Sequence, residues 1–235
     1  MTPAYSEAEV YFENLWQRER LKWLAGEVTP AVMENGATVP VDYCVTTVAR
    51  LVEQPQTPVA AVKAIIDRLK GTNNPNFIYP INSVHISLLG CTPRATTTDS
   101  FEKERIDRIE AVCQGVLKSH SVLPMSLKGV GVIGNQVFIQ VYPHDRQWAE
   151  MRRELEEALL VIGETPIAYP NKAPIHMNIL RLTSGDKSAL TRLLETVEQL
   201  RAVEIGDFMV SAIDYLITDF VLSPANVTLL DQLKF

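Results

Sequence analysis

Two short segments decide the fold of this chain: SVHISLLG at residues 83–90 and PIHMNILR at residues 174–181. Apolar and polar side chains alternate in both, which is typical of a strand with one buried face. The residues that share the apolar faces are Val84, Ile86 and Leu88 in the first strand and Ile175, Met177 and Ile179 in the second. We therefore expect two strands that each pack one face into a core.

The other face of each strand carries a histidine with a hydrogen-bonding side chain two residues later. His85 is followed by Ser87 in the first strand. His176 is followed by Asn178 in the second. If the two strands lie near each other, these four side chains converge on one cleft. The alternative is that both histidines are partly buried strand residues whose ring nitrogens bond to neighbouring carbonyl groups.

The chain around these segments repeats one order of elements. It runs strand, helix, strand, helix, strand from Tyr43, and the same order begins again at Gln136. Tyr79-Pro80 precedes the first histidine strand, and Tyr169-Pro170 precedes the second. The repeat indicates two copies of one βαβαβ unit, joined at a Gly134-Asn135 hairpin turn.

Helical periodicity predicts four helices between the strands and a less regular one near residues 7–25. The four are expected to begin with Thr57 as N-cap and Pro58 at the first helical position, near Ser100, after Asp145 and at Asp186. Strands are expected over residues 43–51, 84–89, 125–133, 136–142, 175–182, 208–222 and 227–233. The fold class is therefore α/β.

The repeat also predicts how the chain divides. Residues 1–40 form a helical N-terminal extension, and residues 41–235 form a single bilobal domain. Its two halves are residues 41–134 and 135–235. A pseudo-two-fold relation between these halves would place the two histidine strands together at the centre.

Composition and charge exclude several classes of protein. The chain has 235 residues, 46% of them hydrophobic and 21% charged, so it can bury a core without disulfides or metal. Its net charge of −6 argues against broad binding of duplex DNA. No apolar run approaches the roughly 18 to 20 residues that span a membrane, and the N-terminus does not resemble a signal peptide. Three cysteines without a C-x-x-C pattern indicate reduced thiols in a cytoplasmic protein.

Other patterns in the sequence favour ordinary structural roles. GVGVIG at residues 129–134 has the spacing of a dinucleotide-binding loop, but a strand follows it where that loop requires a helix. The charged segment 146–157 is expected to be a solvent-exposed helix face. A zinc site formed by His85, His176 and Cys91 stays open as an alternative.

The histidine strands resemble a known family, the two-histidine (2H) phosphoesterases, which include RNA ligase-like 2′,3′-cyclic phosphodiesterases. HISLLG and HMNILR are similar to the two H-x-[S/T] motifs of that family, and GNQVFIQVYP at residues 134–143 is similar to the segment between them. The resemblance covers residues 42–222. It implies two pseudo-symmetric lobes whose antiparallel sheets surround a central cleft. One position departs from the pattern, because Asn178 stands where the family has Thr or Ser.

The resemblance implies that His85 and His176 are catalytic and that Ser87 and Asn178 bind the substrate phosphate. Imidazole can act as base or acid near neutral pH, and hydroxyl and amide groups can stabilise charge that develops on a phosphoryl oxygen. This chemistry requires neither a metal nor a cofactor. Further candidate substrate contacts are Tyr79, Tyr169 and Arg181, while Arg94 and Lys172 could steer an anion.

The sequence thus predicts hydrolysis of a small nucleotide or RNA-end phosphodiester, without interaction with duplex DNA or a membrane. Which histidine is the base stays open, as does the oligomeric state. One alternative is a non-catalytic nucleotide or RNA-end binding module with a degenerate second motif. Another is a structural protein whose N-terminal helix docks onto a second chain.

Overall fold

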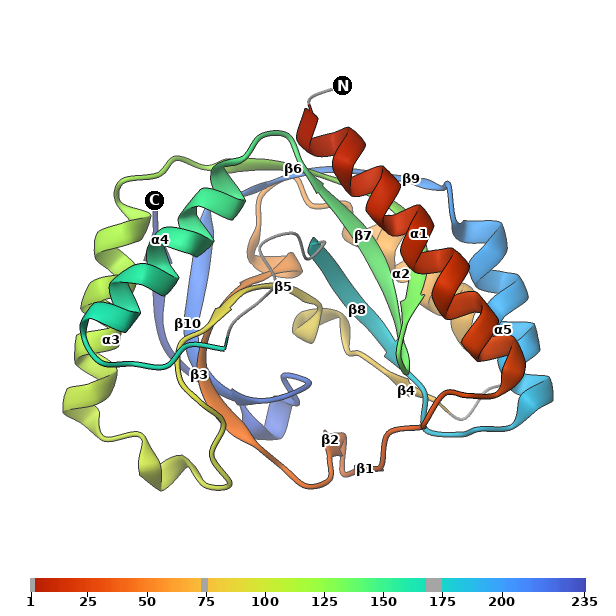
Figure 1. The fold of residues 1–235 in the computed structure, drawn as a ribbon, viewed down its shortest axis with the longest axis horizontal. Coiled ribbons are helices and arrows are strands. Elements are labelled where there is room, and N and C mark those ends of the chain that lie inside the picture. The colour runs from red at the N-terminus through yellow and green to blue at the C-terminus, as the bar shows by residue number, and fades with distance from the viewer. Residues whose placement is uncertain (1–2, 73–75, 168–174) are drawn as a thin grey trace.

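The computed structural model describes residues 3–72, 76–167 and 175–235 (Figure 1). The helices in these ranges are α1 (Pro3–Ala25), α2 (Val59–Lys70), α3 (Lys103–Leu117), α4 (Gln147–Val161) and α5 (Lys187–Leu200). The strands are β1 (Met33–Glu34), β2 (Ala37–Thr38), β3 (Tyr43–Arg50), β4 (Phe77–Ile78), β5 (His85–Gly90), β6 (Leu123–Ile133), β7 (Gln136–Pro143), β8 (Ile175–Arg181), β9 (Glu204–Val210), β10 (Ala212–Asp219) and β11 (Thr228–Lys234). The Tyr169-Pro170 part of the predicted repeat lies outside the described residues.

Two antiparallel sheets form the body of the molecule. One has the strand order β11-β10-β3-β5, and the other has the order β4-β8-β7-β6-β9. Helices α3 and α4 pack beside the first sheet, and α2 and α5 pack beside the second (Figure 1). The two histidine strands, β5 and β8, meet in the middle. The predicted α/β fold with two lobes of antiparallel sheet is confirmed.

The predicted halves, residues 41–134 and 135–235, do not coincide with the two sheets. β6 lies in the first predicted half but belongs to the sheet of β7 and β8, because a tight turn at Gly134 folds it directly onto β7. β10 and β11 return to the sheet of β3 and β5. The predicted strand 208–222 is likewise wrong. It is two strands, β9 and β10, which separate at Ser211 and enter different sheets.

Helix starts follow local hydrogen bonding. Asp186 caps α5 as predicted, since its carboxylate accepts a hydrogen bond from the Ala189 N–H at 2.7 Å. Thr57 does not cap α2. Its hydroxyl instead donates to the carbonyl groups of Leu51 and Gln54, at 3.0 and 2.7 Å, and the helix begins two residues later.

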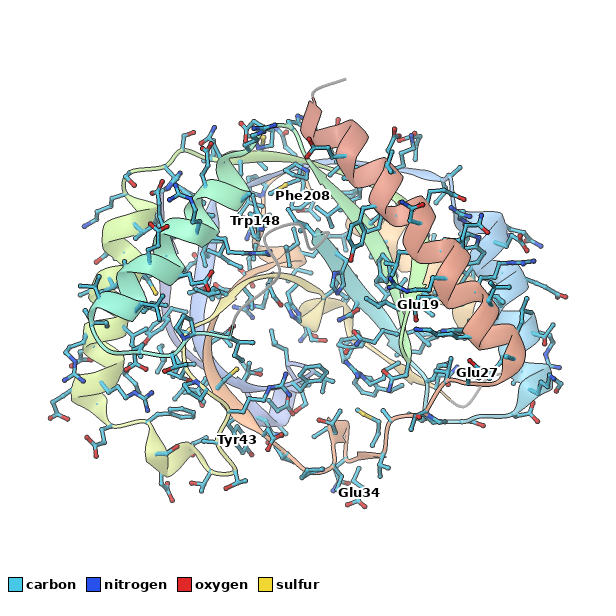
Figure 2. The ribbon with its side chains drawn as sticks, in the orientation of Figure 1. Glu19, Glu27, Glu34, Tyr43, Trp148 and Phe208 are labelled. Atoms are coloured by element: carbon cyan, nitrogen blue, oxygen red, sulfur yellow. The ribbon has the colours of Figure 1, made fainter. Side chains whose placement is uncertain are left out.

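The N-terminal helix α1 packs within this chain, against β6, β7 and α5. Its buried apolar side chains are Phe12, Leu15, Trp16 and Trp23. Trp148 of α4 and Phe208 of β9 are similarly buried in the two lobes (Figure 2). One apolar face of α1 is therefore covered by its own chain, while Val10, Leu21 and Leu24 of the same helix are exposed. None of the helices in the described ranges has the length and hydropathy of a membrane span.

Candidate active site

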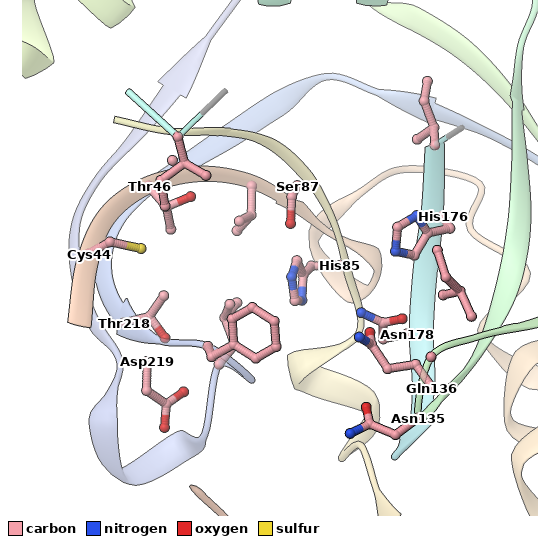
Figure 3. Close-up of a pocket in the computed structure, with 18 of the residues that line it drawn as sticks. Cys44, Thr46, His85, Ser87, Asn135, Gln136, His176, Asn178, Thr218 and Asp219 are labelled. Atoms are coloured by element: carbon pink, nitrogen blue, oxygen red, sulfur yellow. The ribbon is translucent and has the colours of Figure 1, made fainter. Parts of the chain in front are cut away.

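The two histidine strands line one cavity of about 730 Å³ between the sheets. His85 and Ser87 reach it from β5, and His176 and Asn178 reach it from β8 (Figure 3). The alternate residues of both strands point into the core: Ile86, Leu88, Met177 and Ile179. The period of two in the sequence therefore places all four predicted side chains around a common space.

His85 is held as a neutral imidazole with a defined tautomer. Its Nδ1 lies 2.7 Å from the carbonyl oxygen of Ser83, so Nδ1 carries the hydrogen, and in the neutral ring the lone pair is on Nε2. The pKa of His85 is lowered to about 4, chiefly by burial and to a smaller extent by the nearby His176 and Arg50, while the hydrogen bond to Ser83 opposes the shift. At neutral pH the ring is therefore unprotonated, and the lone pair of Nε2 is available.

His176 is half-buried on β8 and packs against an aromatic ring. Its ring centroid lies 5.1 Å from that of Phe138 on β7, with the planes tilted by 58°. Gln140, two residues further along β7, stands directly opposite His176 in the register of the sheet. The second histidine is therefore supported from the neighbouring strand.

The Asn178 amide presents a donor to the cavity. Its nitrogen lies on the side toward His85, and Gln136 lies next to it (Figure 3). Its Oδ1 is buried and has no hydrogen-bond partner among the described residues. The amide of Asn178 can thus act as the hydroxyl of a Thr or Ser would, by donating to a bound oxygen.

Arg152 of α4 is a cavity residue that the sequence analysis missed. Its Nε and Nη2 donate to the carbonyl groups of Leu88 and Ser87, at 2.9 and 3.1 Å. It lies within the segment predicted as a solvent-exposed face. However, it is four residues after Trp148 and three before Leu155, both of which are buried. The helical period therefore did contain a signal that Arg152 borders the buried face.

Tyr79 and Arg181 do not line the cavity, in contrast to the sequence prediction. Arg181 is only 4% exposed, and its guanidinium donates to the Tyr79 hydroxyl at 3.1 and 3.3 Å. It also donates to Oδ1 of Asn135, which does line the cavity, at 3.1 Å. The pair therefore supports the cavity wall from behind. Tyr169 and Lys172 lie outside the described residues.

The far end of the cavity is formed by the first sheet and the turn after β10 (Figure 3). Arg94 lies there with its Cζ 4.2 Å from the ring centroid of Phe220, a cation–π arrangement. Burial raises the pKa of Cys44 to about 11, so its thiol is neutral and unsuited to act as a nucleophile. The Cζ of Arg181 lies 4.8 Å from the same Phe220 ring. The Arg94 guanidinium at this end could attract an anionic ligand.

The zinc alternative lacks its third ligand. Cys91 is fully buried behind the cavity, and its thiol donates to the Leu89 carbonyl at 3.7 Å. Within the described ranges, no three His, Cys, Asp or Glu side chains gather as metal ligands do. The glycine-rich segment lies in β6 and its turn and does not open a helix.

Several solved structures have the same arrangement of sheets and helices. The protein TT0787 of Thermus thermophilus matches with a TM-score of 0.59 and 13% identity, over 81% of this chain and 97% of its own. LigT of E. coli, in a complex with 3′-AMP, matches with a TM-score of 0.55 and 12% identity, over 83% of this chain and 98% of LigT. The chain has the LigT-like two-lobe fold.

A third solved structure, described as a phosphoesterase, matches with a TM-score of 0.51 and 11% identity, over 83% of this chain and 98% of its own. No protein-family model and no curated protein sequence matches the chain. The likeness to LigT is therefore a likeness of fold, and the chemistry has to be argued from the cavity itself.

Proposed function

We propose that this chain is a 2H phosphoesterase that hydrolyses a 2′,3′-cyclic or related nucleotide or RNA-end phosphodiester without a metal ion. The observation that carries the proposal is that His85 and His176 enter one cavity from neighbouring strands of the two sheets. The LigT-like fold supports it, and the 3′-AMP bound to LigT indicates a small nucleotide as the kind of ligand. No cofactor is part of the proposal.

In the proposed reaction, His85 is the base and His176 the acid. Nε2 of His85 takes a proton from water as the water oxygen bonds to phosphorus. The ester bond to the departing ribose oxygen then breaks, and that oxygen receives a proton from the His176 ring. Each such group contributes roughly 10² to 10⁴ in rate. The assignment rests on the low pKa of the buried His85, which keeps the ring neutral at pH 7. With Nδ1–H bonded to Ser83, the neutral ring has its acceptor lone pair on Nε2.

Three groups around the phosphate would stabilise its developing charge. The Ser87 hydroxyl and the Asn178 amide donate to its non-bridging oxygens, which suits donors that are fixed before the reaction. The Arg152 guanidinium, held on the carbonyl of Ser87, adds positive charge beside them. A cyclic phosphate would thus lie between the two imidazoles with donors from both lobes.

The test is a panel of 2′,3′-cyclic mononucleotides and an oligoribonucleotide with a cyclic phosphate end. We expect hydrolysis to a monoester, identified by phosphorus NMR, with the same rate in EDTA. Loss of activity in EDTA that zinc restores would favour a metal mechanism. Tight binding of a nucleoside monophosphate without turnover would favour the binding-module alternative.

The acid side of the pH profile provides a further prediction. Because the His85 pKa is about 4, kcat/KM is expected to change little between pH 6.5 and pH 5. A base with the ordinary histidine pKa of about 6.5 is roughly 3% deprotonated at pH 5 and would lose more than about tenfold. Initial rates across this range distinguish the two. A break near pH 6.5 would contradict the role of His85 as a buried base.

Folding stability should also depend on pH in this range, so its measurement is the control for rate losses that are caused by unfolding. The pKa of His85 is lower in the folded chain than in the unfolded chain. The unfolded chain therefore takes up a proton first, and stability falls as the pH drops from about 6.5 toward about 4. Thermal unfolding at each pH shows where the rates still refer to folded protein.

We also propose that the protein acts in the cytoplasm, in RNA processing. The three cysteines are free thiols, which fits a reducing compartment. Localisation of the tagged chain tests the cytoplasmic location. Accumulation of RNA with cyclic phosphate ends in a deletion strain would support the role in RNA processing.

A further inference from the structure

The second sheet has a cleft-facing side that is only partly open. In the register of β7 and β8, Phe138 stands opposite Asn178 and Gln140 opposite His176. Directly opposed residues in antiparallel strands share a face, so Phe138 lies on the same face as His176 and Asn178. Helix α1 runs along β6 and β7 and leaves β8 uncovered (Figure 1).

A series of aromatic contacts leads from α1 to the second histidine. The Phe12 ring lies 5.8 Å from Phe138 and 5.4 Å from Tyr142, and the Phe138 ring lies 5.1 Å from His176. The Tyr142 hydroxyl donates to the Gln140 side chain at 2.5 Å. Phe12 is 3% exposed and Phe138 is 1% exposed, so neither ring has room to turn without disturbing its neighbours.

On its other side, the Phe138 ring lies against Gly131 of β6. A Cβ atom added at Gly131 on β6 would lie 2.7 Å from Cζ of Phe138, which is closer than real Cβ contacts allow. The Phe138 ring can therefore lie directly against residue 131 only because that residue has no side chain. Phe138 is held between Gly131 and Phe12, and it holds the His176 ring in turn.

Three hydrogen bonds fix α1 and the segment after it relative to the same sheet. The Gly134 N–H donates to Glu19 at 3.1 Å, and the Trp23 indole N–H donates to the Gly134 carbonyl at 2.9 Å. The Asn135 amide donates to the Thr29 carbonyl at 3.2 Å. Since Glu19 is 3% exposed, its bond to the turn is shielded from water, and Phe12 cannot slide along the sheet without breaking it.

We propose that α1 is a positioning element of the active site, in which Phe12 holds Phe138 and Phe138 directs the His176 imidazole toward the cavity. The kinetic part of this inference rests on the proposed function, whereas the ring contact does not. A general acid must point at the leaving oxygen within hydrogen-bond reach, and a displacement of about 1 Å can cost up to about 10²-fold in rate. The N-terminal extension is then part of the catalytic unit.

The experiment compares Phe12→Ala and Phe12→Leu with Val10→Ala, a control on the same helix whose side chain is 62% exposed. The readouts are kcat, KM and the imidazole C–H resonance of His176, assigned by its absence in His176→Ala. We expect Phe12→Ala to shift that resonance and lower kcat at least about fivefold with little change in KM. Phe12→Leu should restore most of both, and Val10→Ala should match the wild type.

Gly131→Ala displaces Phe138 from the opposite side without any substitution in α1. It should shift the same resonance and lower kcat in the same way, even if Phe12→Ala proves too unstable to study. Folded Phe12→Ala or Gly131→Ala protein with unchanged resonance and kcat would overturn the proposal. If the wild type hydrolyses no cyclic phosphate, the proposed function fails, and the resonance alone then decides whether Phe12 positions His176.

Discussion

Alanine at residue 85 or at residue 176 is expected to lower turnover at least about a hundredfold, with the fold intact. Each substitution removes one of the two groups that move a proton in the proposed reaction, and neither imidazole can take over the part of the other from the opposite sheet. The double variant should be little slower than the slower single variant, because base and acid act on one transition state. Initial rates on one cyclic nucleotide measure the effect.

Two other histidines in the chain provide matched controls. His144 lies against Ser126, with Nε2 at 2.8 Å from the hydroxyl, and His120 lies 3.0 Å from Glu154. Neither lines the cavity. Alanine at either position should leave turnover near that of the wild type, and thermal unfolding should show that all four variants are folded. Full activity in folded His85→Ala or His176→Ala would refute the two-histidine mechanism.

The sequence was most informative about features that depend on a single strand, such as which side chains share a face. The faces of β5 and β8 follow from alternation alone, so the convergence of His85 and His176 could be predicted. The sheet to which each strand belongs could not. Every residue of β10 is buried, so no alternation marks its limits, and its run of apolar residues merges with β9 in the sequence. Only the three-dimensional path separates them, at Ser211.

The same limit applies to the cavity. Arg181 and Tyr79 were expected to contact substrate because they adjoin the histidine strands, but each is buried against the other. Arg152 was assigned to a solvated face because charged residues surround it on α4. The link from Phe12 to His176 joins the first helix to the eighth strand, and no local pattern can reveal such a contact. Roles that depend on distant packing required the structure.

The series at residue 178 tests the one departure from the 2H motif, and it includes the largest expected loss beside the histidines. Asn178→Thr should keep most of the activity, because a hydroxyl still donates to the phosphoryl oxygen. Asn178→Ala should lose about 10² to 10³, as when one oxyanion donor is removed. Asn178→Asp should be slower still, because a carboxylate donates no hydrogen bond and repels the phosphate at short range.

The structure sharpens this order. The Asn178 amide nitrogen lies toward His85, while its Oδ1 is buried without a partner among the described residues (Figure 3). Alanine therefore removes a donor from the cavity but also removes an unpaired oxygen, so the loss should appear in rate and not in stability. Asn14→Asp, at an exposed position of α1, controls for the added charge.

Initial rates on one cyclic nucleotide, with thermal unfolding of each variant, decide between three outcomes. The order Thr, Ala, Asp supports an amide that donates to phosphate. An inactive wild type that gains turnover in Asn178→Thr would identify a disabled relative, and the binding-module alternative would replace the enzyme. Equal activity in Asn178→Asp and the wild type would show that residue 178 does not touch the phosphate, because a carboxylate in contact with that charge must slow the reaction.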